Sequence, residues 1–369
     1  MSRTVYLHVG IAKTGTTYLQ RTLFANRELL RRHGTLYPGP GPAAHFLGSL
    51  DLRGTAFKGH VYDGVDGAWQ RLVAAADEFD GTTLISHETL ARAKPADIER
   101  AVTGFGTDDV RVVVTCRDLA RQIPAAWQES MKNRGETGYD DYLAHLFTTR
   151  SAEARPRKGF WVAQDVEDLV RRWSEAVGVG KVTVVTVPRS GADRGELWRR
   201  FASATGLPDV AYLPSPDAAN SSLGVAEAEL LRRLNPKLAN TLDWPGYDVL
   251  VKRRLAEDVL APLDSQGRLR LPATWVDQVR AIADAQIAFL QTSGVTVVGD
   301  LSDLEPEPAD ASARYPDSLT DGELLASALE ALAVLAAQPQ ASTPPDPRQR
   351  VAALRRTVRR VLRRRSSGV

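Results

Sequence analysis

The sequence is poor in sulfur and has no long apolar run. It holds one cysteine, Cys116, and two methionines among its 369 residues. A single cysteine excludes an internal disulfide and a metal cluster built on cysteine ligands. No run reaches the roughly 18 apolar residues of a membrane-spanning helix, and no apolar leader precedes the first expected strand at Thr4. We therefore expect a protein of the reducing cytoplasm.

Acidic residues are missing from one segment near the end of the chain. Residues 348–365 hold nine of the 47 Lys and Arg residues and no Asp or Glu. The other 38 basic residues face 45 acidic ones, a net charge of −7 that argues against nucleic acid as a partner. Apolar residues recur in this tail at helical spacing, as Val351, Leu354, Val358 and Leu362. This pattern is typical of a basic amphipathic helix that contacts an anionic membrane or another polyanion, and a solvated extension is the alternative.

Continuous apolar or β-branched runs alternate with helical patterns in the first half of the chain. The runs predict buried strands at 4–9, 82–86, 110–116 and 181–187. The helical patterns lie at 16–32, 66–78, 95–103, 119–133 and 164–177. Strands separated by helices predict an α/β fold with a parallel, doubly wound sheet.

The rest of the chain divides by composition. Residues 34–64, rich in Gly, Pro and His, are expected to form irregular loops, and residues from about 194 to 300 are mostly helical in pattern. We expect one domain over residues 1–300, followed by linkers with a short helix at 321–337 within 301–347. The arginine-rich tail then covers 348–369.

The most informative stretch is residues 8–20, HVGIAKTGTTYLQ. It joins the first expected strand to the first expected helix, where the unpaired N–H groups of a helix N-terminus attract phosphate. The spacing of Gly10, Gly15 and Thr17 fits the phosphate-binding pattern GxxxxGK[ST], except that Thr16 stands in the place of the lysine. A lysine is found three residues earlier, at Lys13. We therefore predict a phosphate-binding loop whose cation comes from a different point.

Two other strands end in residues that could carry chemistry. Arg117 follows the strand at 110–116, and His87 and Glu88 follow the strand at 82–86. Because ligands of parallel sheets bind at the carboxyl ends of the strands, we expect these residues beside the loop. The planar guanidinium of Arg117 suits a terminal phosphate.

The stretch KTGTTYLQ resembles the 5′-phosphosulfate-binding loop of sulfotransferases that use 3′-phosphoadenosine 5′-phosphosulfate (PAPS). That loop commonly reads PK[ST]GTT followed by an aromatic residue, and Ala12 stands here where the proline is usual. The resemblance implies that Lys13 contacts the bridging oxygen and the 5′-phosphate, and that Tyr18 packs near the adenine. It also implies a set of residues that hold the phosphate oxygens: Thr14, Gly15, Thr16 and Thr17.

The segments that follow the strands at 110–116 and 82–86 resemble segments of the same family. Arg117 matches the arginine of the 3′-phosphate segment, in which the serine expected eight residues later is replaced by Ala125. An acceptor hydroxyl needs a base, and the family's base is a glutamate or histidine just past a central strand, which makes Glu88 the preferred base and His87 the competing one. Residues 220–222, Asn-Ser-Ser, first predict a helix N-cap, and related bacterial sequences place a similar segment near the co-substrate.

The resemblance implies a P-loop-like core and a PAPS-dependent transfer of a sulfuryl group to a hydroxyl of a small molecule, glycan or lipid. The sulfuryl donor carries less charge at the transferred group than a triphosphate does, so no metal is required. The acceptor and the oligomeric state stay open. One alternative is a P-loop nucleotide kinase or NTPase, because Gly10, Gly15 and Thr17 fit that spacing. The other is a catalytically silent binding protein that keeps the fold, to which Ala125 gives weight.

Overall fold

The computed structural model describes residues 3–150, 159–193, 195–213, 222–263 and 267–337. Within them, six parallel strands form one sheet in the order β2-β3-β1-β4-β5-β6. The strands are β1 (Thr4–His8), β2 (Thr35–Leu36), β3 (Thr82–Ser86), β4 (Val110–Cys116), β5 (Val182–Thr186) and β6 (Thr296–Val298). The predicted α/β fold with a parallel sheet is confirmed.

Helices occupy most of the chain between and after the strands. From Thr16 to Thr205 they are α1 (Thr16–Ala25), α2 (Arg27–Arg32), α3 (Ala44–Arg53), α4 (Ala68–Asp77), α5 (Pro95–Thr103), α6 (Leu119–Lys132), α7 (Tyr139–Thr148), α8 (Trp161–Gln164), α9 (Val166–Val177) and α10 (Glu196–Thr205). From Val225 onward they are α11 (Val225–Leu238), α12 (Trp244–Tyr247), α13 (Val276–Thr292) and α14 (Asp321–Ala337). The 3-10 helices are η1 (Glu88–Arg92), η2 (Val179–Lys181), η4 (Ala273–Trp275), η5 (Leu301–Leu304) and η6 (Pro316–Ser318), and η3 (Asp248–Leu260) is a π-helix.

The chain forms two units, residues 1–327 and 328–369, so α14 crosses their boundary. The helix predicted at 321–337 is confirmed as α14. The linker 338–347, the arginine-rich tail 348–369 and the pair Asn220 and Ser221 lie outside the described residues. In the part that is described, no helix is long and apolar enough to cross a membrane. The predicted domain limits at 300 and 347 stay predictions.

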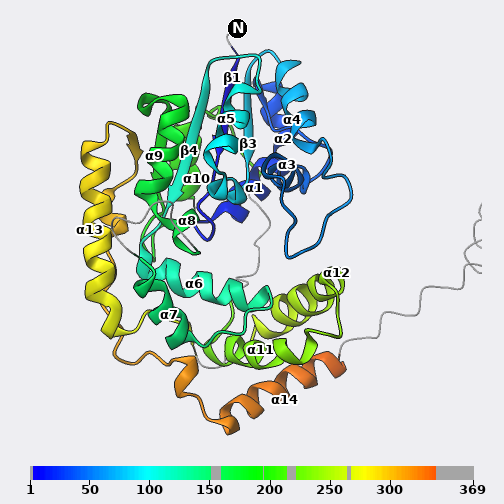
Figure 1. The fold of residues 1–369 in the computed structure, drawn as a ribbon, viewed down its shortest axis with the longest axis vertical. Helices are drawn as coiled ribbons and strands as arrows, with labels where there is room; N and C mark the ends of the chain where they lie inside the picture. Colours follow the sequence, from blue (N-terminus) through cyan, green and yellow to red (C-terminus); the bar gives the residue numbers. More distant parts are fainter. Residues whose placement is uncertain (1–2, 151–158, 194, 214–221, 264–266, 338–369) are drawn as a thin grey trace, which may run out of the picture. The chain divides into compact units, whose positions relative to one another are not determined.

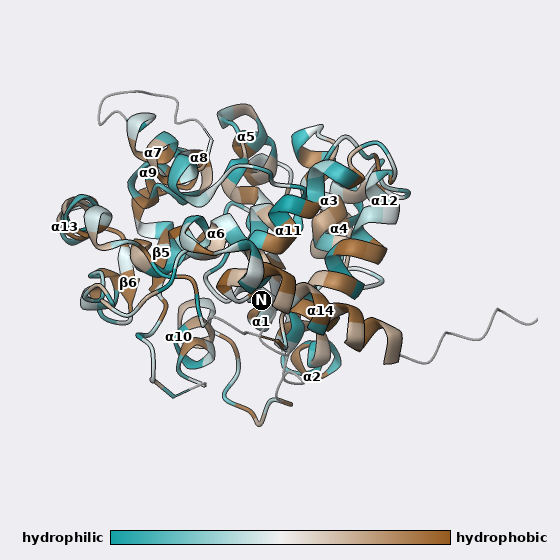
Figure 2. Cartoon of the chain, turned by 90° about the horizontal axis from the view of Figure 1, so that it is seen from below, coloured by the Kyte–Doolittle hydropathy of each residue, from teal (hydrophilic) through white to brown (hydrophobic). Residues whose placement is uncertain are grey.

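Successive side chains of the central strands enter two apolar cores, one on each face of the sheet. Val112 and Val114 of β4 belong to one core together with Trp173 of α9. Val113, between them, belongs to the other core together with Leu19 of α1 and Phe201 of α10. Strands covered on both faces need apolar residues at every position, which explains the continuous runs in the sequence. The covering helices alternate hydrophilic and hydrophobic stretches, as α3 and α4 do in Figure 2.

A helical layer of α6, α7, α11 and α12 lies beyond the carboxyl ends of the strands (Figure 1). The loop between α3 and α4 reaches this layer through aromatic contacts. The indole Nε1 of Trp244 in α12 donates to the hydroxyl of Tyr62 at 2.7 Å, and the ring of Phe57 packs edge-on against Trp244 at 5.4 Å. A ligand at the strand ends would therefore bind between the sheet and this layer.

The structure corrects two expectations. The single helix predicted over 16–32 is interrupted at Asn26, whose side chain donates to the carbonyls of Thr22 and Leu213 and accepts from the N–H of Leu213. Asparagine competes with the helical backbone for hydrogen bonds, which favours a break. The segment 34–64, predicted to be irregular, contains β2 and α3, because α3 packs against α4 and buries Leu50 and Leu52.

Candidate functional site

A cleft of about 650 Å³ opens at the carboxyl ends of the central strands. Its walls come from the β1–α1 loop, the first turns of α1, the start of η1, α6 and η3. The residues that line it are Ala12, Lys13, Gly15, Thr16, Thr17, Tyr18, Arg21, Glu88, Glu129, Ser222, Lys252, Glu257 and Asp258. Six of the residues predicted for the site are among them: Lys13, Gly15, Thr16, Thr17, Tyr18 and Glu88.

The β1–α1 loop needs its two glycines. Gly10 has a φ of +101°, and a Cβ there would lie 2.9 Å from the Cα of Glu88, so only glycine lets the loop run against η1. Gly15 has a φ of +84°, and a Cβ there would collide with the side chain of Leu197 in α10. Lys13 also has a positive φ, of 70°, although it has a side chain. The loop is thus bent into the shape that presents Lys13 to the cleft.

The side chain of Thr14 is held in place by a buried series of hydrogen-bonded polar side chains. Its hydroxyl donates to the carbonyl of Ile11 at 2.5 Å and lies 2.5 Å from the hydroxyl of Thr115 in β4. Thr115 in turn lies 3.2 Å from Nε2 of His8, whose Nδ1 is 2.7 Å from the hydroxyl of Ser86. Burial lowers the pKa of His8 to about 4, so its ring is neutral at physiological pH. The hydroxyl of Thr14 therefore braces the loop instead of facing the cleft.

The N-terminus of α1 is open toward the cleft. Gly15 is its N-cap residue and has no side chain to accept from the first N–H groups. Thr16 and Thr17 follow and line the cleft, Thr16 buried and Thr17 exposed. An uncapped helix N-terminus offers free N–H donors and a positive dipole end, which together favour an anion.

Lys13 is paired with a residue that sequence reasoning did not single out. Its Nζ lies 2.5 Å from Oε2 of Glu129 in α6, and the other carboxylate oxygen accepts from Lys252 of η3 at 3.0 Å. Burial opposes ionisation of Glu129, but Lys13 and Lys252 outweigh that effect and hold its pKa well below the usual range. Glu129 is therefore a charged carboxylate between two cations.

Glu88 and His87 have different surroundings. β3 ends at Ser86, and His87 is the N-cap of η1, where its Nδ1 accepts from the N–H of Thr89 at 3.2 Å. Glu88 lines the cleft, and its Oε2 accepts from the amide of Gln20 at 2.9 Å. Burial alone would raise the pKa of Glu88, but His87 and the Gln20 amide more than offset this and lower it. Glu88 is thus an ionised proton acceptor at the cleft wall, whereas His87 is not among the described residues that line it.

Arg117 lies behind the loop. One of its guanidinium nitrogens, Nη1, donates to the carbonyl of Lys13 at 3.2 Å, and it is not among the described residues that line the cleft. Its Nε is buried and has no hydrogen-bond partner in the described part of the chain. Burial, with a smaller effect of Arg121, lowers the pKa of Arg117 to about 10, and the group stays charged at neutral pH. The guanidinium therefore keeps unused donor capacity next to the loop.

Ser222 belongs to the segment for which the sequence predicts a helix N-cap or a place near the co-substrate. Gly224 is the N-cap of α11, and Ser222 lines the cleft. No sequence motif indicates a role for Glu129 or Lys252. Each lies in a helix, at a position where a charged residue is ordinarily a solvated surface group. Only the fold brings them to the loop, because Glu129 follows Lys13 by 116 residues and Lys252 follows Glu129 by 123.

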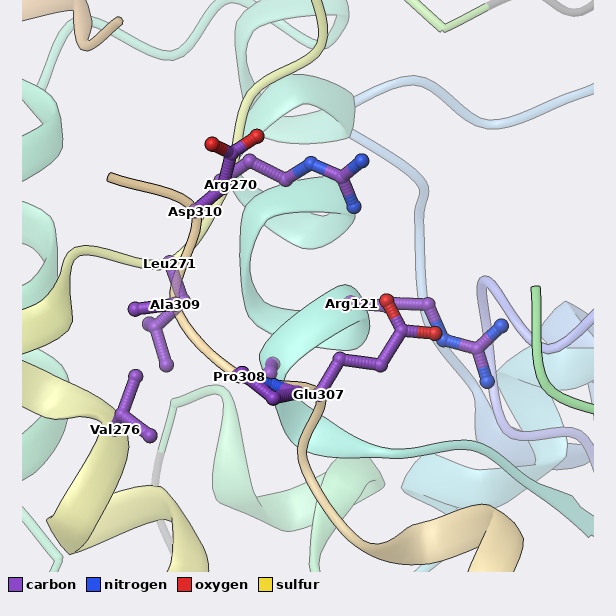
Figure 3. A pocket seen from close by; sticks show the side chains of 9 residues that line it. Arg121, Arg270, Leu271, Val276, Glu307, Pro308, Ala309 and Asp310 are labelled. Atoms are coloured by element: carbon purple, nitrogen blue, oxygen red, sulfur yellow. The ribbon is translucent and has the colours of Figure 1, made fainter. Parts of the chain in front are cut away.

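A second, smaller hollow of about 170 Å³ lies beside the first turn of α6 (Figure 3). Arg121, Arg270, Glu307 and Asp310 line it together with apolar side chains. Arg121 is committed to an ion pair with Asp118 and donates to the carbonyl of Pro188. None of the residues predicted for the site is among the described residues that line this hollow, so the larger cleft is the candidate site.

Comparisons with known proteins do not assign this chain to a family. No family model matches the sequence, and no curated protein matches it. Among solved structures, a sulfotransferase from Alicyclobacillus acidocaldarius is similar, with 17% identity and a TM-score of 0.36. The match covers 69% of this chain and 98% of that one. In the described residues, no group of three or more His, Cys, Asp or Glu side chains is arranged to hold a metal ion.

Proposed function

We propose that this protein is a sulfotransferase that transfers a sulfuryl group from PAPS to a hydroxyl acceptor. One observation carries the proposal: a loop lysine, an uncapped helix N-terminus and an ionised carboxylate line the same cleft. The first two favour a phosphate group, and the third is a base for an attacking hydroxyl. The loop's resemblance to the phosphosulfate-binding loop supports the choice of donor.

The described residues fit such a donor. The cleft's volume of about 650 Å³ falls within the roughly 300–1,000 Å³ of small-molecule sites. Lys13 and the N–H groups of Gly15, Thr16 and Thr17 would hold the 5′-phosphosulfate. Tyr18 is half-buried at the cleft wall and would pack near the adenine, as the resemblance implies. The unpartnered Nε of Arg117 is a donor available to the 3′-phosphate if the guanidinium turns from behind the loop.

The chemistry is an in-line displacement at sulfur. Bound PAPS supplies the sulfuryl group and a phosphate leaving group. Glu88 accepts the hydroxyl proton while the acceptor oxygen bonds to sulfur. Lys13 and the α1 N–H groups hold the phosphate oxygen that keeps the electron pair when its bond to sulfur breaks. The α1 N–H groups are in place before the ligand binds, so their stabilisation of the developing charge requires little reorganisation.

Glu88 is a better candidate for the base than His87. The ring of His87 is engaged with Thr89 on one side and packs against Phe46 at 5.2 Å on the other. Burial lowers the pKa of His87, so its ring is neutral, but its accepting nitrogen already serves the cap of η1. The carboxylate of Glu88 accepts from the Gln20 amide through Oε2 and from its own backbone N–H, and its other oxygen has no side-chain partner among the described residues.

A transfer assay tests this function. The full chain is incubated with PAPS and with hydroxyl compounds that represent small molecules, glycans and lipids. We expect 3′,5′-bisphosphoadenosine to be released together with a sulfated product for at least one class. Release that is the same without any protein, or no sulfated product from any class, would contradict the proposal.

A further inference from the structure

Four side chains form a hydrogen-bonded network, and three of them, Lys13, Glu129 and Lys252, line the cleft. Lys13 contacts Oε2 of Glu129 at 2.5 Å, and Lys252 contacts Oε1 at 3.0 Å. Asn133, one turn after Glu129, donates to the same Oε1 at 2.9 Å and accepts from Lys252 at 3.0 Å. The carboxylate of Glu129 therefore contacts two lysines that come from different elements, the β1–α1 loop and η3.

The network is accessible from the cleft. The side chains of Lys13, Glu129 and Lys252 are 31%, 29% and 20% exposed, so a ligand could reach each of them. Lys13 belongs to the β1–α1 loop at the carboxyl ends of the strands, and Glu129 belongs to α6. Lys252 belongs to η3, which lies between β5 and β6 in the sequence. A ligand held by both lysines would thus connect the phosphate-binding loop to η3.

The groups that contact Glu129 directly are cationic, although the lining of the whole cleft holds three cations (Lys13, Arg21 and Lys252) and four carboxylates (Glu88, Glu129, Glu257 and Asp258). Two lysines share one carboxylate, which leaves one positive charge on the three residues together. Lys132 is a buried residue of α6, three positions after Glu129. Burial lowers the pKa of Lys132 to about 8, so it still adds positive charge at neutral pH. Glu257 and Asp258 also line the cleft, and neither forms a hydrogen bond with Lys13 or Lys252 among the described residues. Glu129 is accordingly the carboxylate that competes directly for both lysines.

We propose that Lys252 is a second cation of the anion-binding site and that Glu129 is an internal counter-ion, which a phosphate or phosphosulfate ester displaces from both lysines. That the anion is a phosphosulfate rests on the proposed function, whereas the displacement itself does not. In the protein without ligand, Glu129 holds the two lysines in the cleft. On binding, the ligand's oxygens take over their hydrogen bonds, and the repulsion between Glu129 and the ligand weakens the affinity.

Two substitutions in the full chain test the roles separately. Glu129→Gln removes the charge and keeps an oxygen that can accept from a lysine, so the variant should bind anions more tightly. Lys252→Met removes the cation and keeps an apolar stem, so it should bind them more weakly. Each dissociation constant is expected to change by about tenfold, the scale of one unit charge in a partly solvated cleft. Titration calorimetry with inorganic pyrophosphate and with 3′,5′-bisphosphoadenosine measures both effects.

Matched controls separate the network from the general charge of the cleft. Glu257→Gln removes a carboxylate from the same cleft that does not touch the lysines, and its gain in affinity should be less than half that of Glu129→Gln. Arg254→Ala removes an exposed cation two residues after Lys252, and it should change affinity by less than about twofold. Lys252→Arg should restore most of the affinity that Lys252→Met loses.

Weaker binding by Glu129→Gln, or unchanged binding by Lys252→Met, would overturn the inference. If Glu129→Gln does not fold, the comparison of Lys252→Met with Lys252→Arg still decides the role of the second cation. The two proposals can fail separately. Altered anion affinities without sulfuryl transfer would leave the inference standing and contradict the proposed function. Sulfuryl transfer with unaltered affinities in every variant would do the reverse.

Discussion

Lys13→Ala is expected to lower kcat/KM for sulfuryl transfer by about 100- to 1,000-fold, the usual effect of removing one donor from a developing oxyanion. The lysine is presented to the cleft by the bent β1–α1 loop and lies next to the open N-terminus of α1. The loss should fall mainly on kcat, because the cation matters most when charge develops on the leaving phosphate oxygen. Initial rates at saturating acceptor and varied donor measure this split.

The control for Lys13→Ala must account for its backbone. Lys58 also has a positive φ, of 53°, is exposed and is not among the described residues that line the cleft, although its charge lies close enough to Lys252 to repel it. Lys58→Ala therefore imposes a similar backbone change without removing the cation, and kcat/KM should change by less than about threefold. A rate for Lys13→Ala equal to that of Lys58→Ala would show that Lys13 has no part in the reaction.

Glu88→Gln is expected to lower kcat by about 100- to 10,000-fold, the range for loss of a general base. The amide has the same shape and can still accept from Gln20, so the cleft should keep its structure and the donor's KM should change little. Initial rates for donor and acceptor, with melting temperatures of each variant, separate loss of chemistry from loss of folding.

His87→Ala is the comparison for Glu88→Gln. Its ring caps η1 and packs on Phe46, so its removal should lower the melting temperature and change kcat much less. A Glu88→Gln enzyme with near-normal turnover beside an inactive, folded His87→Ala enzyme would reverse the assignment of the base.

Four of the six strands could be predicted because each shows a local sequence pattern. β1, β3, β4 and β5 are buried on both faces, and such strands stand out as apolar and β-branched runs. β2 has two residues and β6 has three, too few to show a pattern. α3 was missed because a Gly- and Pro-rich context surrounds it, and it is stabilised by packing on α4.

In the candidate site too, residues close together in the sequence could be predicted, whereas residues brought together by the tertiary fold could not. Lys13, Gly15, Thr16 and Thr17 lie in one continuous loop, so their spacing alone could indicate phosphate binding. Glu129 and Lys252 join them only through the tertiary fold, and a glutamate or lysine in a helix carries no such signal by itself. Arg117 could be placed near the loop, but not behind it, because its hydrogen bond to the carbonyl of Lys13 depends on side-chain packing.

The proposed function requires the cleft to bind the adenosine bisphosphate part of a sulfuryl donor. Its most direct test is the melting temperature of the full chain with 3′,5′-bisphosphoadenosine, with ADP and with ATP and Mg²⁺. At a ~100-fold excess over Kd, a ligand stabilises the folded state by roughly 2.7 kcal/mol, which is enough to raise the melting temperature by several degrees. We predict that the bisphosphate gives the largest increase and that Lys13→Ala reduces it. A larger increase with ATP and Mg²⁺ than with the bisphosphate would contradict the proposed function and favour a nucleotide triphosphate as the ligand.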